Sequence, residues 1–166
     1  MRVPIRKADK YLRPKTDGHM TEAKYLELAL ELEKLTKRVR PRLTEEVKKY
    51  ASDGDFSENA AYQIAKGKLR GINSRITEIE ELLKRAEIIR PQKGSLTVAL
   101  GGTVTVEVSG RQKTFQILGG AESDPSSGII SKDSPLGSKL IGKRVGDKVE
   151  VRVKDKSVEY KIIKIE

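Results

Sequence analysis

The stretch SDGDFSENAAY, residues 52–62, lies between two long helical patterns and interrupts the rhythm of both. Steps of three and four place side chains on one stripe of a helix, as in the seam of a two-stranded coil. Two arms joined by a short glycine-containing turn predict an antiparallel helical hairpin, and each arm of about 30 residues would reach roughly 45 Å at about 1.5 Å per residue. The apolar residues that follow these steps are Tyr25, Leu28, Leu32, Leu35, Val39, Leu43, Val47 and Tyr50 before the stretch, and Ala65, Leu69, Ile72, Ile76, Ile79, Leu83 and Ala86 after it.

Two carboxylates at the predicted tip, Asp55 and Glu58, are three residues apart. This spacing fits a capping box with Asp55 as the N-cap and Glu58 at N3. It also fits a pair of ligands for one hard cation such as Mg²⁺, provided that another protein supplies the remaining ligands and completes a two-metal site. Asp53 adds a third carboxylate, which is more simply read as a solvated loop residue. The spacing leaves both interpretations open.

The ends of the two arms follow from capping residues and prolines. We expect the first helix to begin at Thr21, a fair N-cap, and to run to about Tyr50. Pro41 lies inside it and predicts a kink or break near Arg40, because proline removes a helical hydrogen bond and clashes with the preceding turn. The second helix is expected from about Ser57 to Ile88, with Pro91 after its end.

Composition limits the classes of function. The formal net charge of +10 favours a polyanionic partner such as nucleic acid, and basic residues on both arms near the tip could face it. The absence of cysteine excludes disulfides, thiolate metal sites and cysteine nucleophiles. No phosphate-binding glycine loop, zinc motif or nucleophile–base pair indicates an enzyme. Because the sequence has neither a membrane span nor a signal peptide, we expect a cytoplasmic protein with no membrane partner.

The pattern changes to period two from Ser95 onward, which predicts strands. A short helix is expected over Leu136–Ile141, with Ser134 as N-cap, Pro135 at its first position and Gly142 after its end. The expected strands are Thr103–Val108 and Thr114–Leu118 around a turn at Ser109-Gly110, a short one at Gly128–Ser131, and a final hairpin of Lys148–Val153 with Val158–Ile165. The fold class is therefore α+β: a basic arm over residues 1–20, a coiled-coil domain over 21–90, and a small, mostly antiparallel β domain with one short helix over 91–166.

Gly54-Asp55-Phe56-Ser57-Glu58-Asn59-Ala60-Ala61-Tyr62 resembles the G-D-x-x-E-N-x-x-Y tip signature of the GreA/GreB bacterial transcript-cleavage factors, and of GreA in particular. The similarity extends back through Arg38-Val39-Arg40-Pro41 to Met20-Thr21. It extends forward through Ile130–Leu136, which includes Asp133-Ser134-Pro135, to Leu140–Lys143. It covers about residues 20–166, and the basic arm before residue 20 departs from the family's usual short start.

The resemblance implies an FKBP-like C-terminal domain without isomerase function, which docks on RNA polymerase at the mouth of its secondary channel. The coiled coil would enter the channel, and the polymerase would hydrolyse backtracked RNA near its 3′ end. Asp55 and Glu58 would help to hold a Mg²⁺ ion shared with the polymerase and not bound by the free factor. Tyr62 and Lys66 would lie beside the RNA 3′ end. Asp133, Ser134 and Pro135 would form part of the docking surface of a monomeric factor.

Two alternatives remain open from the sequence. The first lies within the same family: an inhibitory paralogue that occupies the channel without promoting cleavage, although such paralogues tend to have altered tips and this chain keeps the signature. The second is a coiled-coil adaptor that binds DNA or RNA and makes no use of a metal. Binding to naked nucleic acid at physiological salt, without polymerase, would favour the adaptor.

Overall fold

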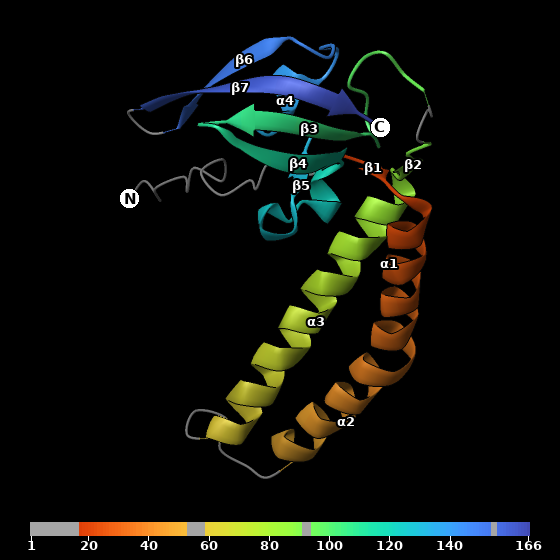
Figure 1. Ribbon diagram of the computed structural model, residues 1–166. Helices are drawn as coiled ribbons and strands as arrows, with labels where there is room; N and C mark the ends of the chain where they lie inside the picture. The colour runs from red at the N-terminus through yellow and green to blue at the C-terminus, as the bar shows by residue number, and fades with distance from the viewer. Residues whose placement is uncertain (1–16, 53–58, 91–93, 154–155) are drawn as a thin grey trace, which may run out of the picture.

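A computed structural model describes residues 17–52, 59–90, 94–153 and 156–166. Within these ranges the chain forms a long helical hairpin and a mixed β-sheet domain, and the hairpin projects away from the sheet (Figure 1). Most of the predicted basic arm and the tip residues 53–58 lie outside the described residues. The α+β class and the helical hairpin followed by a small sheet domain are confirmed.

The first arm consists of α1 (Glu22–Lys34), a π-helical turn η2 (Leu35–Val39) and α2 (Arg40–Ala51). Thr21 is the N-cap of α1, as predicted, and its hydroxyl oxygen accepts a hydrogen bond from the Lys24 amide at 3.2 Å. The predicted break near Arg40 takes the form of the π-helical turn, which ends directly before it. Pro41 then lies in the first turn of α2, where a missing amide hydrogen is tolerated.

The second arm is α3 (Ala60–Lys84), and both of its ends differ from the prediction. Its N-cap is Asn59, so the capping box with Asp55 as N-cap is wrong. Asparagine is as good an N-cap as aspartate and stands directly before the helical pattern. At the other end, Glu87–Ile88 forms a short strand, β2, that pairs in parallel with β1 (His19–Met20). These two strands close the base of the hairpin, where the sequence had suggested a continuing helix and a loose arm.

The two arms pack along the predicted seam, whose residues are half-buried or buried throughout. The best-buried cluster lies at the base of the hairpin and consists of Met20, Leu28, Ile79 and Leu82. Leu82 was not among the predicted seam residues. An ion pair adds to the packing between the arms, because Arg75 donates from Nε and from a terminal guanidinium nitrogen to the two carboxylate oxygens of Glu31, each at 2.9 Å. Hydrogen bonding from Arg75 lowers the pKa of Glu31.

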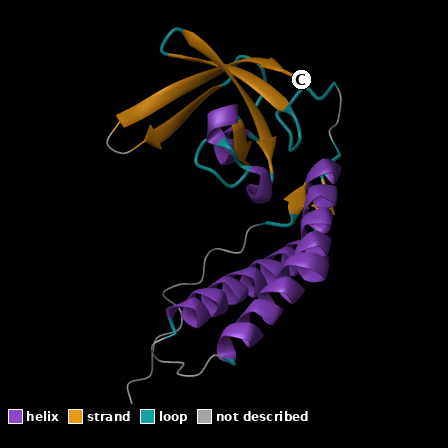
Figure 2. Cartoon of the chain, turned by 90° about the horizontal axis from the view of Figure 1, so that it is seen from below, coloured by secondary structure: helices purple, strands orange, loops and turns teal. Residues whose placement is uncertain are grey.

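The C-terminal domain is a five-stranded sheet in the order β5-β4-β3-β7-β6, antiparallel except for the pair β4–β5. Ser109 (φ 50°) and Gly110 (φ 74°) form the predicted tight turn between β3 and β4. Figure 2 shows the sheet curling around the short helical segments. The elements are β3 (Thr103–Val108), β4 (Arg111–Leu118), the 3-10 turns η3 (Gly120–Glu122) and η4 (Pro125–Ser127), β5 (Ile129–Ser131), α4 (Gly137–Leu140), β6 (Lys148–Val153) and β7 (Lys156–Ile165).

The short helix α4 is shorter than predicted, because its regular part begins at Gly137 and Leu136 occupies the N-cap position. Ser134 still acts locally as a cap: its Oγ accepts a hydrogen bond from the Gly137 amide at 3.0 Å. Pro135 therefore lies in the turn that leads into the helix. Gly142 follows the helix end with φ 80°, as predicted. Among the described residues, no helix combines the length and the apolar character needed to cross a membrane.

Candidate functional site

The candidate site is the tip of the hairpin. Asp55 and Glu58, as well as Asp53, lie outside the described residues, but both ends of the segment that carries them are described. These ends are joined by one side chain. Asn59 Nδ2 donates to the backbone carbonyl of Tyr50 in α2 at 2.9 Å, and Asn59 Oδ1 accepts from the backbone amide of Tyr62 in α3 at 2.9 Å.

This double role of Asn59 bears on the chemistry of the tip. The last carbonyls of a helix and the first amides of the next one lack partners within their own helices. Asn59 satisfies one group of each kind and so ties the last turn of α2 to the first turn of α3. The N-cap of α3 is therefore Asn59 and not the predicted Asp55. Sequence reasoning missed Asn59, although an asparagine directly before a helical pattern is a recognised start signal.

Tyr62 and Lys66, predicted to lie beside an RNA end, are brought together on α3. They are one helical turn apart, and Lys66 Nζ lies 5.5 Å from the centre of the Tyr62 ring. This distance is within the range of a cation–π interaction. Tyr62 is half-buried and Lys66 is exposed.

Both arms of the hairpin carry exposed basic side chains. A positive surface of this kind attracts phosphates from solution and raises their local concentration. The sequence predicted a basic stripe that could face nucleic acid, and such a stripe must be exposed to solvent. All of its residues are exposed: Arg38, Arg40, Arg42, Lys48, Lys49, Lys66, Lys68 and Arg70. Its binding to nucleic acid stays a prediction.

The second predicted site lies at the other end of the molecule, in the loop from Ser131 to Pro135, here called the docking loop. Asp133 and Pro135 are exposed, whereas Ser134 is half-buried. Ser134 Oγ donates to the Ser131 carbonyl at 2.6 Å and accepts from the Gly137 amide at 3.0 Å. Ser134 therefore shapes the loop, and Asp133 and Pro135 are the two side chains that it presents.

The tip carboxylates are the candidate metal ligands that the sequence predicts. Within the described residues, no three histidine or acidic side chains are grouped closely enough to hold an ion. The donors that the tip sequence offers are carboxylates from Asp55 and Glu58, which suit a hard ion such as Mg²⁺. Two carboxylates form an incomplete ligand set, so this donor set fits an ion whose other ligands come from a partner.

Comparisons with known proteins agree on one family. The model "Transcription elongation factor, N-terminal" of the GreA/GreB group matches residues 19–88, and "Transcription elongation factor, GreA/GreB, C-term" matches residues 93–166. The chain is 40% identical to transcription elongation factor GreA of Thermomicrobium roseum over 141 residues, which cover 84% of this chain and 90% of the relative. It is 39% identical to GreA of Paracoccus denitrificans over 148 residues, with 88% and 95% coverage.

Solved structures of the same group are also similar. The crystal structure of GreA factor homolog 1 (Gfh1) of Thermus thermophilus matches with 28% identity and a TM-score of 0.41, covering 89% of this chain and 97% of that one. The GreA/GreB structure from Nitrosomonas europaea matches with 20% identity and a TM-score of 0.39, covering 88% and 96%.

Proposed function

The chain belongs to the GreA/GreB family of transcription elongation factors, and on that premise we propose that it stimulates the cleavage of backtracked RNA by RNA polymerase. The observation that carries the proposal is the Asn59 contact to Tyr50 and Tyr62. It joins the last turn of α2 to the first turn of α3, at the two ends of the segment that contains Asp55 and Glu58, and it provides the N-cap of α3 in place of the one predicted at Asp55. The acidic pair is then available as ligands.

The two parts of the chain have separate tasks in this proposal. The sheet domain binds the polymerase through the docking loop, with Asp133 and Pro135 in contact with the partner. The hairpin, whose second helix α3 has 25 residues, carries the tip to the polymerase active centre. Polymerase binding and the stimulation of cleavage therefore depend on different ends of the molecule. A variant can lose one of these activities while it keeps the other.

At the tip, Asp55 and Glu58 supply carboxylate oxygens to a Mg²⁺ ion that the polymerase also binds. Such an ion, when bound, stabilises negative charge on the reacting phosphate and lowers the pKa of a bound water. Because this chain offers only an incomplete ligand set, it is not an enzyme by itself, and the catalyst remains the polymerase. No Mg²⁺ is bound by the factor alone.

Tyr62 and Lys66 contact the RNA near its 3′ end. The Lys66 ammonium attracts a phosphate, and the Tyr62 ring offers a surface on which a base can stack. Both contacts tolerate any base, as a factor that acts on many transcripts requires. The exposed basic residues of α2 and α3 add a non-specific attraction to nucleic acid. The factor acts as a monomer in the cytoplasm, where the polymerase works.

The deciding experiment uses a stalled, backtracked elongation complex with labelled RNA. We expect the factor to shorten the RNA and to restore elongation, and the Asp55→Asn, Glu58→Gln double variant to bind without shortening it. A factor that binds the complex and blocks both cleavage and elongation would instead be an inhibitory paralogue. Tight binding to naked RNA or DNA at physiological salt, with no effect on the complex, would identify an adaptor.

A further inference from the structure

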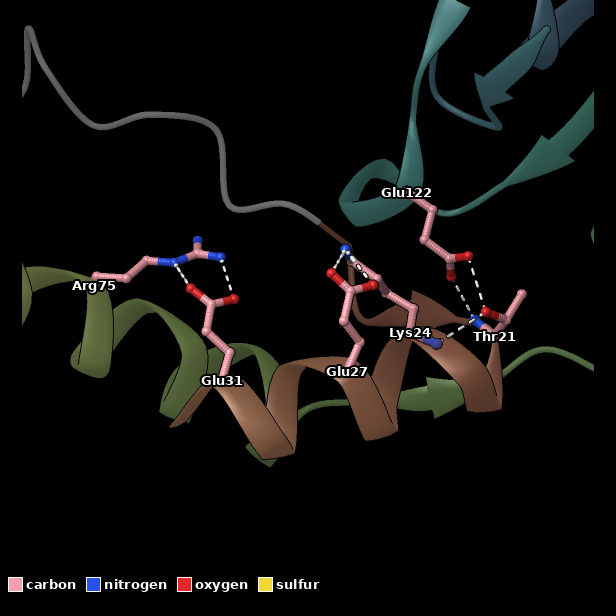
Figure 3. A network of polar contacts seen from close by, with 6 residues as sticks. All are labelled: Thr21, Lys24, Glu27, Glu31, Arg75 and Glu122. Carbon is pink, nitrogen blue, oxygen red and sulfur yellow. Dashed lines mark hydrogen bonds and ion pairs between the residues drawn. The ribbon is translucent and has the colours of Figure 1, made fainter. Parts of the chain in front are cut away.

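The base of the hairpin is attached to the sheet domain by a contact between residues 101 positions apart in the chain. Both carboxylate oxygens of Glu122, in η3, accept hydrogen bonds from Thr21: one from its backbone amide at 2.5 Å and one from its hydroxyl at 2.9 Å (Figure 3). Thr21 is the N-cap of α1, so Glu122 places a negative charge at the positive end of the helix dipole. Charge-assisted pairs of this kind are stronger than neutral ones and fix direction as well as distance.

Next to this contact, the backbones of the two segments are packed too closely to admit a side chain at Gly119. A Cβ atom added to Gly119 would lie 1.6 Å from the carbonyl oxygen of His19 in β1. The next amide, that of Gly120, donates to Asp17 Oδ1 at 2.8 Å. The segment Asp17–Thr21 therefore lies directly against Gly119–Glu122, and we call this contact the junction.

A lysine connects the junction to the docking loop. Lys132 Nζ lies 3.2 Å from Asp17 Oδ2 and 3.0 Å from His19 Nδ1. The next residue, Asp133, is exposed in the docking loop. One short segment thus contacts the base of the hairpin on one side and presents the proposed polymerase contact on the other.

The length of the hairpin makes the angle at the junction important. The 25 residues of α3 extend about 37 Å at about 1.5 Å per residue, so a rotation of about 10° at the base moves the far end by about 6 Å. Catalytic groups lose much of their effect when they are misplaced by about 1 Å. A tip on a long lever therefore needs a base whose direction is fixed.

We infer that Glu122 and Gly119 are positioning residues, which fix the direction in which the hairpin leaves the docking domain and so align the tip. This inference rests on the proposed function, but its structural part can be tested without polymerase. Two contacts support it. The backbone of Gly119 packs against the backbone of His19, and the carboxylate of Glu122 accepts hydrogen bonds from Thr21 at the start of α1.

The test measures the distance between two spin labels, one on the hairpin and one on the sheet domain. The chain contains no cysteine, so Glu45→Cys in α2 and Gln112→Cys in β4, both exposed, provide two unambiguous attachment points. We expect a single narrow distance distribution in the otherwise unchanged chain. Glu122→Ala and Gly119→Ala should broaden it or shift it by several ångströms.

Two variants serve as controls. Gly67→Ala makes the same substitution as Gly119→Ala at a position in α3 where an added Cβ meets nothing within 4 Å, so it should leave the distribution unchanged. Thr21→Ser keeps both donors to Glu122 and should preserve the distribution. A distribution in Glu122→Ala that matches the unchanged chain would overturn the inference, even if Gly119→Ala fails to fold.

A second readout uses the backtracked elongation complex and the unlabelled variants. Glu122→Ala should lower the cleavage rate at saturating factor by about tenfold or more, while its affinity for the polymerase stays the same. Altered distances with an unchanged cleavage rate would also overturn the positioning role. If the unchanged chain gives no cleavage at all, the proposed function fails, whereas the distance measurement still decides whether Glu122 fixes the hairpin.

Discussion

Asn59 and Tyr50 are joined across the tip of the hairpin by a hydrogen bond of 2.9 Å from the Asn59 side chain to the Tyr50 carbonyl oxygen. The same asparagine caps α3, so its donor and its acceptor serve different helices. Asparagine suits both tasks because its amide carries a donor and an acceptor on one planar group. The link therefore uses one side chain and two backbone groups.

The first prediction separates the two roles of Asn59. Asn59→Ala removes the cap and the link and should lower the free energy of unfolding by about 1–2 kcal/mol. Asn59→Asp keeps the cap acceptor but sets a carboxylate against the Tyr50 carbonyl, so it should lower stability by about 1 kcal/mol. Urea unfolding followed by circular dichroism measures both. An Asp variant as stable as the unchanged chain would show that the link to Tyr50 contributes nothing.

The second prediction concerns the Arg75–Glu31 ion pair between the arms. Because hydrogen bonding to Arg75 lowers the folded-state pKa of Glu31, the pair stabilises the fold above the unfolded pKa of about 4.3, and this stabilisation is lost as pH falls through the lower folded pKa. Both side chains are about one-third exposed or more, so screening should limit the loss in Glu31→Gln at pH 7 to less than about 1 kcal/mol.

The predicted loss of stabilisation at low pH can be checked by measuring the free energy of unfolding from pH 3 to pH 7, in steps of about half a unit. The measurement compares the unchanged chain with Glu31→Gln. The two curves should converge at the acid end and also at high salt, which screens exposed pairs. Glu33→Gln is a suitable control for the contribution of pairing between the arms, because Glu33 pairs with Lys37 within the first arm. A difference for Glu31→Gln that grows as pH falls would contradict the assignment.

The hairpin could be predicted from the sequence because its seam repeats over many residues, and each arm needs only the other arm to bury that seam. The strands at the base of the hairpin and the N-cap of α3 were not predicted from the sequence. Glu87–Ile88 has no pattern of its own, and it becomes a strand because His19–Met20 lies beside it. Likewise, nothing near Thr21 in the sequence indicates Glu122, since their contact depends on how two separately folded parts meet.

The candidate site shows the same limit. The tip signature identified Asp55 and Glu58 by type and order, and the spacing of four placed Tyr62 over Lys66. The choice between two neighbouring N-caps, Asp55 and Asn59, depended on where the first turn of α3 begins, and helix boundaries are the least certain feature of any sequence reading.

The third prediction assigns separate roles within the docking loop. Asp133→Lys and Pro135→Ala alter the two exposed side chains and should weaken polymerase binding, while cleavage at saturating factor stays unchanged. Ser134→Ala removes two hydrogen bonds inside the loop and should lower both affinity and stability. Glu107→Lys makes the same charge change at an exposed position of β3 and serves as the control. Unchanged affinity in Asp133→Lys with Pro135→Ala would remove this loop from the interface.

The last prediction tests the charge at the tip. Because Asn59 caps α3, the Asp55→Asn, Glu58→Gln double variant should unfold at the same temperature as the unchanged chain. A hard cation is held by charge, so the variant should lose most of its stimulation of RNA cleavage while it still binds the polymerase. Raising the Mg²⁺ concentration should restore part of the activity if weaker binding of the ion is the cause. The measurement is the cleavage rate in a backtracked complex against Mg²⁺ concentration, beside a melting curve. Full activity in the double variant would refute the metal role, and a large loss of stability would show that these side chains support the fold of the tip instead.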